Sequence, residues 1–392
     1  MFSYLSTHTP KSVAELCEKV CELTSTRQAI APSGNGTLQH IGGNFRQAVH
    51  QIRLTELNQV IDYPARDMTI TVGAGITLKK LNEILLTEGQ QLAVDCPLPE
   101  MTTMGGAIAV NTSGPRRFGL GTLRDYLIGI SFVNNLGEVA SAGGRVVKNV
   151  AGYDLMKLMT GSLGTLGIIT QVTLKLKPIP EAKAAMIVPL SKMQLPALME
   201  LLNKTQTRPV VQQWWNAPTA ETMIAFEDNR PAVEWSISTI AKELQGAGFN
   251  SFVHLDSNEY QNKLQNLTNF SYSADHPMTW KAVFRPSRTV AFCQHLLEKY
   301  EGALNVHLGN GIVFGWLNGQ ENDAHCRLVH TELVQKVHQH GGMFTVLQHP
   351  PSIAESLELW GDGGAERVLM KNIKLHLDPA STFNPGRFVD GI

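Results

Sequence analysis

Three glycine-rich loops in the first half of the chain restrict its possible folds more than any other feature. They read PSGNGT at residues 32–37, TTMGGAIA and then NTSG within residues 102–114, and GSLGTLGII at residues 161–169. Glycine permits positive φ angles and lets successive backbone N–H groups approach an anion such as a pyrophosphate. One such loop is usually an ordinary turn. Three in the same half of a chain favour a dinucleotide that lies across several loops.

The common nucleotide-binding motifs do not account for these loops. The nearest candidate for a Rossmann fingerprint is GAGITL at residues 73–78, where Leu78 occupies the position of the third glycine. No suitably placed acidic residue follows it, and no Gly-Lys-Ser/Thr sequence is present. Residues 73–78 are therefore interpreted as a simple strand-to-helix turn.

Composition excludes several classes of function. The 392 residues carry a net charge of −1 without a run of Lys and Arg, which argues against a nucleic-acid-binding protein. Charged residues form only 17% of the chain, against roughly 25% in ordinary soluble domains, so we expect a cofactor or partner subunit to cover some surface. The five cysteines form no Cys-x-x-Cys sequence, so neither an iron–sulfur cluster nor a zinc site is expected.

The sequence predicts no membrane span and no exported form. Gly, Asn, Gln, His or Pro interrupts each charge-free window, and the N-terminal MFSYL lacks a basic leader. We expect reduced thiols and a cytoplasmic chain, or one held peripherally at the inner membrane by partner subunits.

The chain divides near residue 180, where Pro178 and Pro180 indicate a linker. Before it, helical and β patterns alternate, including a hairpin predicted over residues 128–142. After it, predicted helices at residues 192–203, 232–245, 288–300 and 323–340 alternate with short β-rich segments. This alternation predicts an α+β domain with one antiparallel sheet.

The order of the loops, together with residues 148–155 and 167–170, resembles the FAD-binding domain of the vanillyl-alcohol oxidase and p-cresol methylhydroxylase family. The resemblance implies an α+β fold in which residues 1–180 form a two-part FAD-binding domain. Residues 181–350 would form an α+β cap with an antiparallel sheet, and residues 351–392 would return to the FAD domain. In that family the first loop cradles the FAD pyrophosphate and the other two hold the remaining parts of the cofactor.

The resemblance also implies a set of FAD-binding residues and a non-covalent cofactor. Thr37 stands where members that tether FAD carry histidine, and His40 lies three residues further on. The implied FAD-binding residues are Pro32, Ser33, Gly34, Asn35, Gly36, Thr37, Thr102, Thr103, Gly105, Gly106, Asn111, Ser113, Gly114, Arg116, Gly119, Gly164, Gly167, Ile168, Asn384 and Arg387.

Within that family, SGPRRFG at residues 113–119 and NPGR at residues 384–387 resemble the small FAD-binding subunits of bacterial glycolate oxidases. Such subunits accompany a larger flavoprotein subunit and an iron–sulfur subunit. The resemblance therefore implies that the chain takes part in oxidising glycolate to glyoxylate, with electrons passing through flavin to an iron–sulfur partner.

One departure from related 2-hydroxy-acid dehydrogenases concerns a metal. Their His-x-Gly-Asp-Gly-Asn-x-His metal and substrate motif corresponds to HLGNGIVF at residues 307–314, with Asn310 in place of the aspartate and Phe314 in place of the second histidine. No Glu-His pair lies near residues 361–364. A divalent metal needs several converging ligands, so no metal site is expected and His307 is interpreted as a packed residue.

Two alternatives to the subunit hypothesis stay open. In the first, this chain oxidises a 2-hydroxy acid unaided, with His307 or Tyr153 as the base and an arginine that binds the carboxylate. Arg116, Arg117 and Arg387 are the candidates for binding phosphate or carboxylate. In the second, the chain is a non-catalytic scaffold that holds FAD only for stability, or not at all.

Overall fold

The computed structural model describes residues 3–144, 153–270, 276–318, 322–361 and 363–392. The chain divides into two compact units. Unit 1 comprises residues 1–113, 122–179 and 363–392, and unit 2 comprises residues 114–121 and 180–362.

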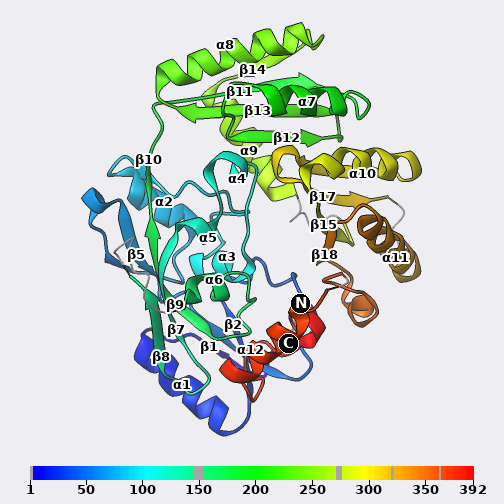
Figure 1. Cartoon of the computed structure of the whole chain (residues 1–392). Helices are drawn as coiled ribbons and strands as arrows, with labels where there is room; N and C mark the ends of the chain where they lie inside the picture. Colours follow the sequence, from blue (N-terminus) through cyan, green and yellow to red (C-terminus); the bar gives the residue numbers. More distant parts are fainter. Residues whose placement is uncertain (1–2, 145–152, 271–275, 319–321, 362) are drawn as a thin grey trace. The chain divides into compact units, whose positions relative to one another are not determined.

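Unit 1 contains a small parallel sheet and a larger antiparallel sheet (Figure 1). The parallel sheet has the order β1-β3-β2, from β1 Thr7–His8, β2 Ala29–Ser33 and β3 Val49–Arg53. The antiparallel sheet has the order β4-β5-β9-β7-β8, from β4 Val60–Asp62, β5 Thr69–Gly73, β7 Leu127–Val133, β8 Val139–Gly143 and β9 Ile168–Lys175. A third pairing joins β6 Gln90–Gln91 to β10 Lys177–Pro178. The α-helices of the unit are α1 Val13–Ser25, α2 Leu78–Leu86, α3 Met104–Val110, α5 Leu123–Tyr126, α6 Leu155–Met159 and α12 Glu366–Leu377.

Local sequence accounts for the helices that support the sheets of unit 1. The Ser12 side chain accepts a hydrogen bond from the Glu15 N–H and so caps α1. Leu16, Val20 and Leu23 follow at helical spacing and are all buried. They share one core with residues of β2, β3, β7 and β9 and with Phe383 from the C-terminal segment.

Unit 2 is built on one eight-stranded antiparallel sheet of order β14-β11-β13-β12-β16-β17-β15-β18. Its strands are β11 Ala182–Pro189, β12 Val211–Trp215, β13 Glu221–Asp228, β14 Val253–Leu255, β15 Thr279–Val283, β16 Gly302–His307, β17 Ile312–Leu317 and β18 Met343–Gln348. Its α-helices are α4 Arg117–Leu120, α7 Leu195–Lys204, α8 Arg230–Gly246, α9 Ser257–Asn269, α10 Pro286–Lys299 and α11 Asp323–Gln339.

The two faces of this sheet differ because successive side chains of a strand point to opposite sides. One face carries Trp214, Trp280 and Leu304, which pack with α7, α8, α10 and α11 in the largest core. On the opposite face, Trp215 and its neighbours pack against Leu264 and other residues of α9. That second face also carries several polar side chains, which belong to β12, β15 and β16.

The structure confirms the predicted fold class, with mixed helices and antiparallel sheets and the expected hairpin at β7 and β8. It also contains β11, β13 and α9, which the sequence patterns did not reveal. Part of the block at residues 148–155 lies outside the described residues.

The observed units differ from the expected domains at residues 114–121 and at the second boundary. Residues 114–121 cluster with unit 2 because Gly119 donates its N–H to the Val210 carbonyl at 3.3 Å. In addition, Arg116 pairs with Glu227 of β13 at 3.2 Å. Unit 2 extends to residue 362 rather than to residue 350.

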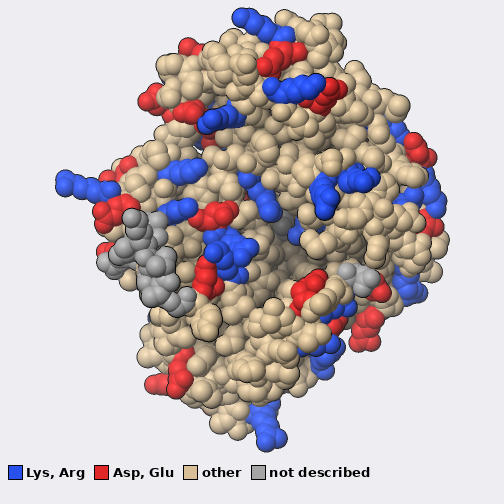
Figure 2. Space-filling model, in the orientation of Figure 1, with Lys and Arg blue, Asp and Glu red and all other residues tan. Residues whose placement is uncertain are grey.

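The charges on the molecular surface are mixed in sign. Figure 2 shows Lys and Arg interspersed with Asp and Glu on the visible face. None of the helices in the described parts of the chain is both long and apolar enough to cross a membrane.

Candidate functional site

Unit 1 contains a pocket where the three glycine loops and the C-terminal segment meet. It encloses about 880 Å³, the open space at its mouth included. The lining residues are Pro32, Ser33, Gly34, Asn35, Gly36, Thr37, Leu38, Gln39, Ile41, Phe45, Leu54, Ala74, Thr102, Thr103, Gly105, Gly106, Ala109, Val110, Leu163, Gly164, Gly167, Ile169, Asn384 and Arg387.

The first loop follows β2 and lies directly against the N-terminus of α3. A Cβ atom at Gly34 would lie 2.1 Å from Thr103 Oγ1, so only glycine permits this approach. Gly36 has a φ of +78°, which glycine adopts without strain. The buried Ser33 hydroxyl has no hydrogen-bond partner among the described residues. Because a buried hydroxyl normally finds a partner, Ser33 Oγ is available to a bound group.

The second loop forms the start of α3, where two adjacent glycines have different surroundings. The Thr103 side chain caps the helix by accepting the Gly106 N–H at 3.3 Å. A Cβ atom at Gly105 would lie 2.9 Å from Ala74 Cβ, so Gly105 packs against protein. A Cβ atom at Gly106 would meet only Thr103 Oγ1, at 3.1 Å. Gly106 therefore leaves room on the pocket side of the helix.

The third loop is held by the C-terminal segment, far away in the sequence. Asn384 Nδ2 donates to the Leu163 carbonyl at 2.6 Å, and the Asn384 N–H donates to the Ile30 carbonyl at 2.9 Å. Gly164 has a φ of +66°, and a Cβ atom there would lie 3.0 Å from Asn384 Nδ2. Loop and segment therefore fit together only with glycine at position 164.

Arg387 closes the pocket wall beside the first loop. Its guanidinium donates to the carbonyls of Gln39, Ile41 and Gly43. It also lies over the Phe45 ring, 5.3 Å from the ring centre. Burial lowers the pKa of Arg387 to about 10, so the side chain is still charged at neutral pH. These bonds fix the path of residues 39–43, whereas the sequence analysis had proposed Arg387 for binding phosphate or carboxylate.

A buried ion pair anchors the segment that carries Asn384 and Arg387. Lys374 Nζ on α12 donates to Asp378 Oδ2 at 2.6 Å, and to the carbonyls of Thr165 at 2.7 Å and Phe383 at 3.0 Å. The Asp378 carboxylate also accepts the N–H groups of Thr382 and Phe383. The pair is therefore fully hydrogen-bonded, as a buried pair must be to persist.

Most of the predicted FAD-binding residues line this pocket, but six do not: Asn111, Ser113, Gly114, Arg116, Gly119 and Ile168. Asn111 instead ends α3 in a left-handed conformation. Gly114, Arg116 and Gly119 belong to unit 2. Ile168 is fully buried in the core, and its neighbour Ile169 lines the pocket, because strand side chains alternate between faces.

The implied set of FAD-binding residues omits ten lining residues: Leu38, Gln39, Ile41, Phe45, Leu54, Ala74, Ala109, Val110, Leu163 and Ile169. Ala109, Leu163 and Ile169 lie inside the predicted loops. Leu38, Gln39 and Val110 directly follow the first two loops, which could have been extended by a few residues. Leu54 and Ala74 carry no local signal, because only the tertiary fold brings them to the wall.

The donor set of the pocket fits a long ligand that is anionic at one part and apolar at another. None of the lining residues is acidic. Glycine backbone and the hydroxyls of Ser33, Thr37 and Thr103 provide hydrogen-bonding groups, whereas Phe45, Leu54 and other apolar residues provide flat contact surface. These properties suit the pyrophosphate and the aromatic rings of FAD.

In unit 2 the segment expected to replace the metal motif forms a turn between two strands. His307 ends β16, and a 3₁₀ turn at Leu308–Asn310 leads to Gly311, which has a φ of +69°. Burial, with a contribution from Arg117, lowers the pKa of His307 to about 3, so the imidazole is neutral. Phe314 packs beside it, with ring centres 5.3 Å apart. Within the described residues, no three His, Cys, Asp or Glu side chains converge as metal ligands.

Several known proteins resemble this chain. Residues 6–143 match the family model described as an FAD binding domain. Glycolate oxidase subunit GlcD of Bacillus subtilis (strain 168) is 32% identical over 45% of this chain and 38% of its own length. Glycolate oxidase subunit GlcE of Escherichia coli (strain K12) is 31% identical over 44% of this chain and 49% of its own length. The aligned parts therefore span less than half of either relative.

Longer but more distant similarities extend over the whole chain. A D-2-hydroxyglutarate dehydrogenase of Xanthomonas citri pv. viticola is 24% identical over 97% of this chain and 88% of that protein. A structure of alkyldihydroxyacetonephosphate synthase superposes with a TM-score of 0.71 over 97% of this chain and 77% of its own, at 17% identity. At that identity the likeness establishes the fold alone. Residues 6–143 thus belong to an FAD-binding domain, and FAD is the cofactor of this domain.

Proposed function

We propose that this chain is an FAD-dependent oxidoreductase subunit that binds FAD non-covalently in the unit 1 pocket and takes part in oxidising glycolate to glyoxylate. The observation that carries the proposal is the pocket itself, which lies where three glycine loops meet and mostly within the stretch that matches the FAD binding domain. The glycolate oxidase subunits among the relatives support the substrate class.

The residues of unit 1 would bind and orient the cofactor. Ser33 Oγ and the backbone of residues 34–37 would hold the pyrophosphate, and the α3 glycines would admit it close to the backbone. Phe45 and Leu54 would contact the apolar parts. Bound FAD supplies an acceptor for the hydride that leaves the carbinol carbon, while the hydroxyl proton goes to a base and the C–O bond becomes a carbonyl.

The wider setting of the proposed activity is a complex. A larger flavoprotein subunit and an iron–sulfur subunit would accompany the chain, in the cytoplasm or peripherally at the inner membrane. The substitution of Asn310 and Phe314 for metal ligands supports a division of labour, in which a partner performs the metal-assisted oxidation and this chain relays electrons.

A second function, oxidation of a 2-hydroxy acid by this chain unaided, is favoured by the similarity to a D-2-hydroxyglutarate dehydrogenase over 88% of that protein. Neither proposed base is well suited to the step, because a pKa lowered to about 3 makes His307 a weak proton acceptor and Tyr153 is 92% exposed. A water-exposed phenol is a poor candidate for the base.

The visible absorption spectrum of the purified chain tests both functions. We expect a flavin spectrum after incubation with FAD and gel filtration, and we expect trichloroacetic acid to release all of the flavin. A flavin that stays oxidised under anaerobic glycolate supports the relay function, and bleaching supports the unaided function. A chain that binds no FAD contradicts both.

A further inference from the structure

One face of the unit 2 sheet carries a row of polar side chains, of which only His307 has had a part in a function proposed so far. In the strand register, Gln213 of β12 lies opposite His307 of β16. Asn305 of β16 lies opposite Phe314 of β17, which lies opposite Lys281 of β15. Opposite residues in antiparallel strands project to the same side of a sheet. The four polar residues and Phe314 therefore share one surface.

Two atoms of this row are buried without a hydrogen-bond partner. Gln213 Nε2 donates to Asn305 Oδ1, and Asn305 Nδ2 donates to the Leu267 carbonyl at 2.9 Å. Gln213 Oε1 and His307 Nδ1 remain without a partner among the described residues, although Gln213 is 0% exposed and His307 is 3% exposed. Buried polar atoms are normally paired, so these two indicate that a ligand group belongs between them.

The two unpartnered atoms belong to residues that lie directly opposite each other, so one hydroxyl group could reach both. Directly opposite residues in antiparallel strands have Cβ atoms about 4.5–5.5 Å apart. A hydroxyl both donates and accepts, so it can donate to Gln213 Oε1 and accept from His307 Nδ1 when the neutral imidazole carries its proton on that nitrogen.

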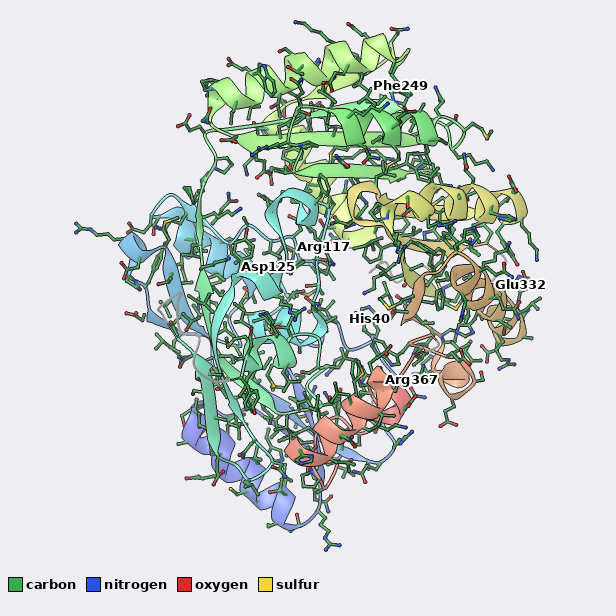
Figure 3. The ribbon with its side chains drawn as sticks, viewed as in Figure 1. His40, Arg117, Asp125, Phe249, Glu332 and Arg367 are labelled. Atoms are coloured by element: carbon green, nitrogen blue, oxygen red, sulfur yellow. The ribbon has the colours of Figure 1, made fainter. Side chains whose placement is uncertain are left out.

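Two cations lie near the same row. Arg117, labelled in Figure 3, is the first residue of α4. This helix lies against the turn that follows β16, because a Cβ atom at Gly309 would be 2.3 Å from the Phe118 ring. The Arg117 charge adds to the effect of burial in lowering the pKa of both Lys281 and His307, so the guanidinium is close to both.

Lys281 has no ion-pair partner among the described residues. The neighbouring Arg116 differs, because Glu227 accepts two hydrogen bonds from it, at 3.3 and 3.2 Å. Two cations that disfavour each other's charge in a partly desolvated site create a place where an anion is stabilising.

We propose that this row is a recognition site for a small 2-hydroxy acid that works without a metal ion. Arg117 and Lys281 bind the carboxylate, Gln213 and His307 bind the hydroxyl, and Phe314 provides the apolar floor. The choice of a 2-hydroxy acid rests on the proposed function, whereas the anion and hydroxyl subsites rest on the unit 2 geometry.

Calorimetric titration of the FAD-bound chain tests this site. The ligands are glycolate, ethylene glycol, which lacks the carboxylate, and inorganic phosphate, which lacks the carbinol. All titrations are run with EDTA present. We expect glycolate to bind, and we expect ethylene glycol and phosphate to bind at least tenfold more weakly.

Two variants and one control identify the residues. K281M and H307F should each lower glycolate affinity at least tenfold, whereas K299M, which removes a partly exposed lysine of unit 2, should leave it unchanged. H307F also removes an unpartnered buried nitrogen, so its thermal stability should not fall. A purely structural His307 would show no loss of glycolate affinity in this variant.

The outcomes separate this proposal from the proposed function. FAD-bound protein that shows no glycolate binding overturns the site and leaves the flavin function intact. Equal binding of phosphate and glycolate would show an anion site without hydroxy-acid recognition, and binding that EDTA abolishes would show a metal site. Failure to bind FAD contradicts the proposed function while the variants can still be titrated in the apo form.

Discussion

Replacing Gly106 by leucine should exclude FAD while leaving the fold of unit 1 intact. A side chain at this position meets only the Thr103 hydroxyl, 3.1 Å from the new Cβ atom, and otherwise extends into the pocket. Gly36 is less suitable for this test, because its φ of +78° would strain any other residue whatever the space around it.

The expected magnitudes follow from helix propensity and from ligand linkage. Leucine in place of glycine inside α3 favours the helix by about 0.5–1 kcal/mol, and crowding against Thr103 offsets part of that gain. The stability of the apo form should therefore change by about 1 kcal/mol or less. Wild-type protein at a hundredfold excess of FAD over its Kd should gain about 2.7 kcal/mol. At roughly 2–4 °C per kcal/mol, that gain is a Tm rise of about 5–10 °C, which the variant should lose.

The assay combines flavin content after gel filtration with thermal unfolding in the presence and absence of FAD. Gly246→Leu is the matched control, because a Cβ atom at this exposed helical glycine of unit 2 meets nothing within 4 Å. The control should keep the full FAD-dependent rise in Tm. If Gly106→Leu retains wild-type flavin content and the same Tm rise, the assignment of the pocket to FAD is wrong.

Three further predictions concern the C-terminal anchor, the pocket wall and the polar row. Lys374→Met should lower the free energy of unfolding by about 3–5 kcal/mol, because it leaves the buried Asp378 carboxylate without its cation. Lys371→Met removes an exposed ion pair with Asp390 and should lower the free energy of unfolding by about 1 kcal/mol or less. Equal losses for the two variants in urea titrations would contradict this prediction. Arg387→Gln should weaken FAD binding at least tenfold in fluorescence titrations, because the carbonyls of Ile41 and Gly43 in the pocket wall lose their hydrogen-bond donor. Unchanged affinity would show that the pocket wall keeps its conformation without the Arg387 guanidinium. Burial and the Arg117 charge lower the pKa of Lys281 to about 8, so the folded chain binds fewer protons than the unfolded chain between about pH 8 and 10.5. The free energy of unfolding should therefore rise with pH in that window, and Lys281→Met should remove this rise. Identical slopes of the free energy of unfolding against pH in wild type and variant would refute the prediction.

The local signals in the sequence located many helices and strands because their causes are local. Ser12 caps α1, and the apolar spacing of Leu16, Val20 and Leu23 marks its buried face. The sequence patterns did not reveal α9, because this helix is rich in Asn and Gln. Its signals were Asp256 with Glu259, which form a capping box, and the buried Tyr260, Leu264 and Leu267 at helical spacing.

The glycine loops were identified because glycine is required where backbones approach closely, as at Gly34 against Thr103. The limits of the pocket were harder to predict, because they depend on contacts between distant segments. Nothing near Leu163 in the sequence indicates that Asn384 bonds to its carbonyl. Likewise, tertiary contacts such as the packing of Gly119 on Val210 and the ion pair of Arg116 with Glu227 show that residues 114–121 belong with unit 2.

The row in unit 2 was invisible to sequence reasoning for a related reason. His307 stood out through its motif, but Gln213 and Lys281 lie in ordinary strand sequences. Their common surface follows from the order β12-β16-β17-β15, which no local pattern encodes.

The bond between Asn384 and Leu163 also sets an order of events during synthesis. The two residues lie 221 positions apart, so at about 5–20 residues per second the ribosome needs roughly 10–45 seconds to make the chain between them. Throughout that interval the side chain that later fixes the third loop has not yet been made. Stable capture of the cofactor is therefore a late event in the life of each new chain, and a ribosome-bound chain arrested before Asn384 should retain no flavin.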